Sequence, residues 1–435
     1  MTAIPTSATL FAYQVGFGDC FLLRLSYDDG TRRHVLIDFG TTGLPKNAPR
    51  DQMQRIARDI EAKCREPGGN GLNVIVATHR HQDHISGFST RADGTGTGDI
   101  IAGLNPGVVI QPWTEAPDAP VDWEGPEGSK PGPAFRRHVR TFKAIEATAR
   151  EALRFVDNAE KAKAISPDLA GRLRFIGEDN LSNLSAVRNL QRMGRRREYV
   201  FHGCALDLSD ELPGVQVDVL GPPTLRQTET IRRQVSRQKD EFWHLAARRM
   251  SYAADMAASK PLFPDAPAFS AKRMPIEYRW LQHRIDETNA ELVLSLVRAL
   301  DDEMNNTSVV LVMRLGGRTL LFPGDAQWEN WAYALQSPLA ALLDDVDLYK
   351  VGHHGSLNAT PKSMWNRFRK KGPKSKADRL TSVLSTRKGK HGHDEDNTEV
   401  PRRTLVNELK AQSTLHDTEA LGPAALCQVI EITLT

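Results

Sequence analysis

The hydrophobic pattern of the chain begins with short apolar runs separated by Asp and Gly turns. These runs predict β-strands at Leu10–Tyr13, Cys20–Leu25 and His34–Asp38. Apolar residues then recur at helical spacing over 50–63, and the almost wholly apolar run Asn73–Thr78 predicts a strand buried on both faces. The first part of the chain is therefore predicted to combine strands and helices in one layer system.

The pattern changes near residue 112. A Pro- and Gly-rich stretch over 112–133 predicts a loop, and long helical patterns follow at 135–164, 183–193, 227–259 and 275–300, with one β-like piece near 198–223. Paired arginines recur in this region, as at Arg136-Arg137 and Arg232-Arg233.

Strand patterns return after residue 300. A hairpin is predicted at Ser308–Leu315 and Arg318–Phe322, with further strands over 346–351, 380–385 and 427–434 and helices over 361–370 and 404–412. This order predicts one α/β domain whose halves are 1–111 and 301–435. Residues 112–300 then form a mainly helical insertion, with the piece near 198–223 belonging to the core.

Composition narrows the class of protein only modestly. Lys and Arg total 57 and Asp and Glu total 54, a net charge of +3, which is too mild to predict nucleic-acid binding from charge alone. We expect a cytoplasmic protein, because no apolar run approaches the ~20 residues of a membrane span and no secretory signal is visible. The four cysteines lie far apart, which favours a reducing compartment over a disulfide framework.

The strongest chemical signal directly follows the buried strand. His79, His81, Asp83 and His84 lie within six residues, so their side chains leave one tight loop and can converge on metal. Neutral imidazole and carboxylate ligands suit zinc, manganese or iron. A polar surface loop is the alternative, but three His and one Asp at the end of an apolar strand make it a poor explanation.

Two later sites fit the same chemistry. Asp325 follows a strand and a Pro-Gly turn, where its carboxylate could bridge two cations, although a Gly-Asp turn alone is commonplace. His353 and His354 end another apolar strand, so alternation predicts that they point in different directions. We favour His353 as a metal ligand and His354 as a general acid facing the substrate.

Several motifs, in order, resemble the metallo-β-lactamase superfamily. They are the HxHxDH pattern at 79–84, VGFGDC at 15–20, IDFG at 37–40, NNTSVVL at 305–311, FPGD at 322–325 and KVGHHGS at 350–356. Together they are similar to the hydrolase domain of ComEC-type DNA-uptake proteins and its stand-alone relatives. The resemblance covers about 1–110 and 301–435 and implies a four-layer αββα fold.

The resemblance also implies roles for particular residues. Asp38 would brace the metal loop, and His393, in a Gly-His pair similar to the family's GHP, would be the last ligand. Here Asp394 replaces the proline, so a solvated loop is the alternative and His391 is a second possible ligand. His202 lies where many members have a third-motif histidine, but we interpret it as structural.

A site of this composition would hold two divalent cations, zinc or else manganese or iron, and activate a hydroxide between them. One set of ligands would be His79, His81, Asp325 and His353, and the other Asp83, His84, Asp325 and His393. Asp83 and His354 would take a direct part in catalysis.

The resemblance implies hydrolysis of phosphodiesters, often DNA, and the arginine pairs of the insertion are compatible with phosphate contacts. A small phosphodiester, a phosphorylcholine ester or a lactone or lactam ring is the alternative within enzymes. A non-catalytic metal-binding module that recognises a protein partner through its insertion stays open as a different class.

Overall fold

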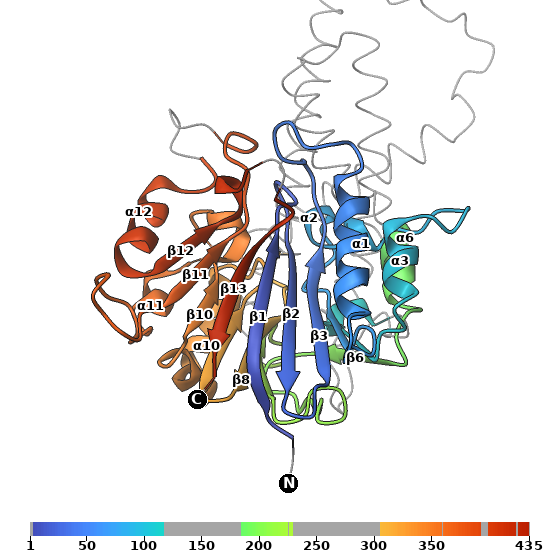
Figure 1. Ribbon diagram of the computed structural model, residues 1–435. Coiled ribbons are helices and arrows are strands. Elements are labelled where there is room, and N and C mark those ends of the chain that lie inside the picture. The colour runs from blue at the N-terminus through green and yellow to red at the C-terminus, as the bar shows by residue number, and fades with distance from the viewer. Residues whose placement is uncertain are drawn as a thin grey trace, which may run out of the picture.

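The computed structural model describes residues 3–116, 184–224, 226–228, 305–358, 360–392, 399–422 and 425–434. These residues form two mixed β-sheets with helices on their outer faces, so the α/β class is confirmed (Figure 1). The predicted helical patterns at 135–164, 227–259 and 275–300 lie outside the described residues.

The first sheet has seven strands. In spatial order they are β13 (Cys427–Thr433), β1 (Pro5–Tyr13), β2 (Cys20–Tyr27), β3 (Arg32–Phe39), β4 (Val74–Val76), β5 (Val108–Pro112) and β6 (Arg196–Val200). From β13 to β3 the neighbours pair antiparallel, and from β3 to β6 they pair parallel. The parallel half therefore ends β3, β4 and β5 at one edge of the sheet.

The second sheet repeats this division with six strands. In spatial order they are β12 (Thr414–Asp417), β11 (Thr381–Leu384), β10 (Leu348–Lys350), β9 (Arg318–Phe322), β8 (Val310–Leu315) and β7 (Gln216–Gly221). From β7 to β9 the strands pair antiparallel, and from β9 to β12 they pair parallel. Both sheets thus carry a parallel half whose carboxyl ends form an edge, where ligands of α/β proteins usually bind.

Three hydrophobic clusters hold the layers together. One joins the two sheets through side chains such as Phe21 and Phe322. A second packs the outer face of the first sheet, including Leu22, against Ile56 and neighbouring helical residues. A third packs the outer face of the second sheet against Trp331 and its neighbours. Alternate strand residues point to opposite faces, so each sheet buries one face on the other sheet and one on helices.

Short helices cover both outer faces. Helices α1 (Gln52–Cys64), α3 (Thr97–Ala102) and α6 (Leu184–Leu190) lie beside the first sheet, and α10 (Trp328–Gln336), α11 (Lys362–Trp365) and α12 (Arg403–Gln412) beside the second (Figure 1). The one-turn helix α2 (Gln82–Ile85) lies at the edge where β4 ends. The 3₁₀ turns are η1 (Ser86–Phe88), η2 (Trp113–Glu115), η5 (Pro338–Leu343), η6 (Gly352–Gly355) and η7 (Thr418–Ala420).

Most predicted strands are confirmed, including the hairpin of β8 and β9. The β-like piece near 198–223 is two strands rather than one, β6 in the first sheet and β7 in the second. The helix predicted over 361–370 is shorter, since α11 ends at Trp365. Sequence patterning did not predict α3, β5, α10 or β12. All four are short, so a periodic signal has few positions over which to build.

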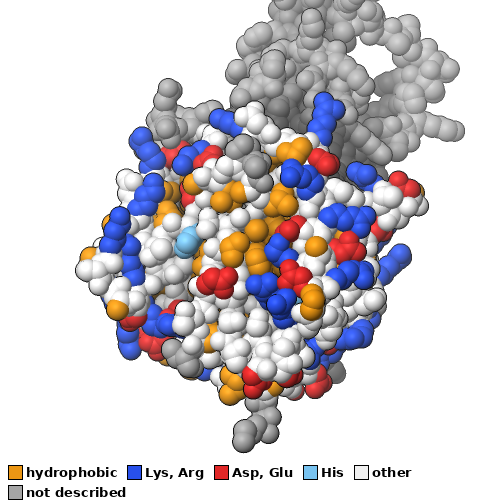
Figure 2. Space-filling model, in the orientation of Figure 1, with side chains coloured by type: hydrophobic (Ala, Val, Ile, Leu, Met, Phe, Trp, Pro, Cys, Tyr) orange, Lys and Arg blue, Asp and Glu red, His pale blue; other side chains and the backbone are white. Residues whose placement is uncertain are grey.

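Charge is mixed over the face seen in Figure 2, where Lys and Arg side chains are interspersed with Asp and Glu rather than gathered in one basic patch. Within the described ranges, no helix combines the length and apolar character required to cross a membrane.

The buried His34 of β3 predicts an acid-sensitive fold. Burial lowers its pKa to about 4, whereas the unfolded chain titrates near 6.5. The unfolded state therefore takes up the proton first, so stability falls as pH drops below about 6.5 and levels off near 4. Between pH 7 and 5 this group should reduce the free energy of unfolding by about 2 kcal/mol. Urea unfolding of the wild type and His34→Gln at both pH values measures the difference. Equal pH dependence in the two proteins would contradict it.

Candidate metal centre

Ionisable side chains from both sheets meet where the parallel strands end. Asp38 comes from the end of β3, the His79–His84 loop follows β4, and Asp325 follows β9. His353 and His354 follow β10 in the turn η6. Among the described residues, three groups place ligand atoms within 4.8 Å of one another, and their members are Asp83, His84, Asp325 and His354; His79, His81 and Asp83; and Asp19, Asp38 and His84.

The loop after β4 brings its histidines together over a short distance. His79 Nε2 lies 3.0 Å from His81 Nδ1, and the rings of His79 and His84 have centroids 4.1 Å apart. Helix α2 carries Asp83 and His84 and rests closely on the loop after β3. At Gly40 an added Cβ would lie 2.5 Å from the Asp83 carbonyl carbon, so this contact requires a residue without a side chain.

Arg80, between the two histidines, lies on the opposite side of this arrangement. Its guanidinium binds the buried carboxylate of Glu115 in a bidentate pair at 2.9 and 2.7 Å. Glu115 follows β5, so this pair attaches the metal loop to the neighbouring strand end.

Asp38 orients the loop from below, as the resemblance implied. Its carboxylate accepts hydrogen bonds from the Thr78 amide and hydroxyl at 2.7 and 2.8 Å, and His84 Nδ1 lies 2.8 Å from it. Asp38 has a φ of 54°, a left-handed conformation that costs energy for a residue with a Cβ. With its Nδ1 bonded to Asp38, His84 presents Nε2 to the other sheet, which is how metal-binding histidines are usually oriented.

Asp325 joins the two sheets at this point. Its Oδ2 lies 3.1 Å from His84 Nε2 and 3.6 Å from His354 Nε2. Its backbone N–H donates to the Ser308 hydroxyl at 3.2 Å. The preceding Gly324 has a φ of +54°, and a Cβ there would lie 2.8 Å from Thr78 Cβ, so glycine permits the close approach of the two sheets.

The two histidines of η6 differ in exposure and direction. His354 is fully buried, with Nε2 at 2.9 Å from Asp83 Oδ2 and Nδ1 at 3.1 Å from the Ser385 carbonyl oxygen. His353 is 27% exposed, and its Nε2 lies 4.0 Å from Asp325 Oδ2. The sequence analysis favoured His353 as ligand and His354 as the acid; the structure instead brings His354 into the ligand group.

Backbone conformation is the reason for this placement. β10 ends at Lys350, so strand alternation does not extend to the histidines. Both have positive φ, 43° at His353 and 51° at His354, and the Asp325 carboxylate accepts a hydrogen bond from the His353 amide at 3.0 Å. Two consecutive left-handed residues with side chains are strained, and such strain clusters at functional sites.

A buried ion pair lies beneath the centre. Lys350 and Asp19 are both buried, and the Lys350 ammonium pairs with the Asp19 carboxylate while lying 3.5 Å from Asp325 Oδ1. It also donates to the Gly324 carbonyl at 3.2 Å. Lys350 comes from the second sheet and Asp19 from the turn before β2 of the first. The pair therefore compensates buried negative charge and ties the two sheets together.

The electrostatics of the centre follow from this crowding. Burial opposes ionisation of Asp325, but the neighbouring His84, His354 and Lys350 outweigh it and hold its pKa well below the usual range. Burial also opposes the charging of His84, yet Asp325 and Asp38 raise its pKa well above the usual value. Burial and the adjacent His84 lower the pKa of His79. A cation bound here would take over the positive charge that His84 otherwise supplies as a proton.

The remaining candidates lie elsewhere or outside the description. His393 is not among the described residues. His391 packs its ring on Phe17 at 4.1 Å, and burial lowers its pKa to about 4. His202 Nδ1 lies 2.8 Å from the Leu220 carbonyl oxygen and its ring packs on Tyr333, so it belongs to none of the ligand groups formed by the described residues.

Sequence reasoning assigned no role to Asp19, Lys350 or Glu115. The first two were visible as parts of motifs, and a lysine within an apolar strand such as Leu348–Val351 is itself a signal that a buried partner exists. Glu115 gave no signal, because its partner Arg80 appears in the sequence only as a residue between two histidines.

The donor set fits a divalent cation. Imidazole nitrogens and carboxylate oxygens face one another in a buried group, and His84 Nε2 makes no hydrogen bond although Asp325 Oδ2 lies 3.1 Å away. Fixed acceptors bind the other nitrogens of His84 and His354. These buried His and Asp groups could therefore hold a metal ion.

Comparison with models of known protein families gave no match, and comparison with curated proteins gave none either. Inference of function therefore rests on the residues of the centre.

The contrast between the η6 histidines predicts unequal effects on metal affinity. His354→Ala removes a nitrogen from the ligand group and should weaken binding by more than the 10–100-fold typical of residues that only orient ligands. His353→Ala should weaken it less. Calorimetric titration of metal-free protein with Zn²⁺ or Mn²⁺ measures both, with apo-protein thermal unfolding as a folding control. A larger loss in His353→Ala would reverse the assignment.

The buried ion pair predicts a large cost for removing its cation. Lys350→Met leaves the Asp19 carboxylate buried without its partner, so we expect a loss of about 3–5 kcal/mol in the free energy of unfolding in EDTA. Adding Asp19→Asn should recover part of this loss. The exposed Lys374→Met is the matched control. Equal stability of Lys350→Met and Lys374→Met would show that the pair contributes nothing.

Proposed function

We propose that this chain is a metal-dependent hydrolase of metallo-β-lactamase type that cleaves phosphodiesters. The observation that carries the proposal is the convergence of His79, His84, His354, Asp83 and Asp325 at the edge where the parallel strands of both sheets end. The HxHxDH, FPGD and KVGHHGS motifs support the same class, since their residues supply this group. The helix–sheet–sheet–helix order of the described layers is compatible with the four-layer αββα fold.

The ligand groups suggest two neighbouring positions for divalent cations, most simply zinc, with manganese or iron as alternatives. His79, His81 and Asp83 would hold one, and Asp83, His84, Asp325 and His354 the other. Cations bound there would supply an activated hydroxide and neutralise negative charge on the reacting phosphate.

The chain's own residues would prepare this chemistry. Asp38 and the Ser385 carbonyl keep the nitrogens of His84 and His354 directed at the ligand position. Lys350 and Asp19 keep the Asp325 turn in place without contacting solvent. The strained backbone of η6 holds His354 inward and leaves His353 partly exposed at the same turn.

His353 is the residue that we propose faces the substrate. Its partly exposed imidazole lies beside the ligand group and not within it, so it can hold a proton for the leaving oxygen. This exchanges the roles that the sequence analysis gave to His353 and His354.

Hydrolysis assays test the function. Metal-loaded protein should cleave bis(p-nitrophenyl) phosphate and linear DNA or RNA, EDTA should abolish the activity, and added metal should restore it. Asp83→Asn should reduce the rate roughly 1,000-fold. His202→Gln, which lies outside the ligand groups, should retain both metal and activity.

Other substrates decide between the alternatives. Metal-loaded protein that leaves every phosphodiester intact but opens a lactone or lactam ring would replace the phosphodiesterase by a small-ring hydrolase. Protein that binds metal yet hydrolyses none of these substrates would contradict the enzymatic proposal as a whole.

A further inference from the structure

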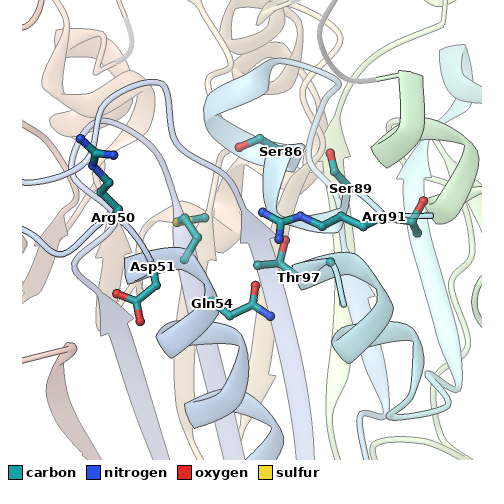
Figure 3. A pocket seen from close by; sticks show the side chains of 10 residues that line it. Arg50, Asp51, Gln54, Ser86, Ser89, Arg91 and Thr97 are labelled. Atoms are coloured by element: carbon teal, nitrogen blue, oxygen red, sulfur yellow. The ribbon is translucent and has the colours of Figure 1, made fainter. Parts of the chain in front are cut away.

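A pocket of about 540 Å³ lies beside the metal loop, within the size range of ligand sites. It is formed where α1 and α3 begin and where the chain turns out of α2 (Figure 3). Its lining residues are Arg50, Asp51, Met53, Gln54, Ser86, Ser89, Thr90, Arg91, Gly96 and Thr97.

The pocket combines cationic and hydroxyl groups. Figure 3 shows the Arg91 side chain reaching across the pocket above Thr97, with the Ser86 and Ser89 side chains on the same side and Asp51 at the far end. The structure records no ion pair of the Arg91 guanidinium within the described part of the chain. A guanidinium beside hydroxyl donors is suited to the oxygens of a phosphate.

The segment that carries Arg91 is fixed in place. The Asp99 carboxylate accepts hydrogen bonds from the backbone N–H groups of Arg91 and Gly96, both at 2.9 Å. Its negative charge is thereby directed to the backbone of this loop. Gln54 of α1 donates to the Thr95 carbonyl at 2.8 Å and holds the same loop against the helix.

The pocket adjoins the ligand group through one short turn. Ser86 lines the pocket and lies two residues after the ligand candidate His84, so their Cα atoms are at most about 7.6 Å apart. Ser86 is held in this position by Thr41, whose amide donates to its hydroxyl at 2.9 Å. A phosphate in the pocket would therefore be offset from one at the metal centre by about the width of this turn.

We infer that the pocket binds a second phosphate of the substrate, next to the phosphodiester that reacts. This inference rests on the proposed function and deepens it, since a compound with only one phosphodiester could not occupy both positions. It assigns the enzyme to substrates with successive phosphates, that is, to polynucleotides. Arg91 is then a substrate-binding residue that sets specificity and does not contact the reacting atoms.

The test compares Arg91→Gln with Arg58→Gln, which removes the same charge from an exposed site on α1. Binding of a fluorescein-labelled single-stranded oligonucleotide is measured by anisotropy in EDTA over a range of salt concentrations. Arg91→Gln should weaken binding about tenfold and reduce the salt slope by roughly 0.7. Arg58→Gln should do neither.

Kinetics separate this inference from the proposed function. With metal, Arg91→Gln should raise KM for the oligonucleotide about tenfold and leave cleavage of bis(p-nitrophenyl) phosphate unchanged. Equal oligonucleotide binding by the two variants, or an equal loss on both substrates, would overturn the second-phosphate site. If the wild type binds oligonucleotide through Arg91 but cleaves no phosphodiester, the pocket stands and the proposed hydrolase fails.

Discussion

The structure depends on the neutralisation of carboxylates buried between its two sheets. Asp19 and Asp38 belong to the first sheet's strands and turns, Asp325 belongs to the second, and all three are buried. Isolated charges in such a place would be prohibitively costly, so each needs a cation or a hydrogen-bond donor. Lys350 and His84 provide these from opposite sheets, and the contacts cross the sandwich in both directions. A metal ion would strengthen the same balance.

This requirement connects the fold to the chemistry. The parallel halves of both sheets end at one edge, so the turns after β3, β4, β9 and β10 all reach the same small volume. Left-handed backbone at Asp38, His353 and His354 then turns the side chains in the needed directions. The strain at these residues is tolerated because hydrogen bonds to Thr78, Asp325 and Ser385 hold them there.

Much of this arrangement could be predicted from local sequence patterns. The apolar run before His79 predicts a buried strand, and the hairpin of β8 and β9 follows from two apolar runs around a Gly-Gly turn. Short elements such as β5 and α3 escaped prediction because too few residues carry their periodicity. The β-like piece near 198–223 reads as one unit in sequence, yet its two strands join different sheets, and only pairing partners decide that.

The sequence by itself determined which ligand types are present and in what order, because His, Asp and their spacing after apolar strands follow from the covalent chain. Tertiary structure decided which imidazole faces the carboxylates. The left-handed turn after Lys350 brings His354 inward to Asp83, and strand alternation could not anticipate it. It also decided that Asp19 and Lys350, far apart along the chain, neutralise one another, since only the stacking of two sheets brings them into contact.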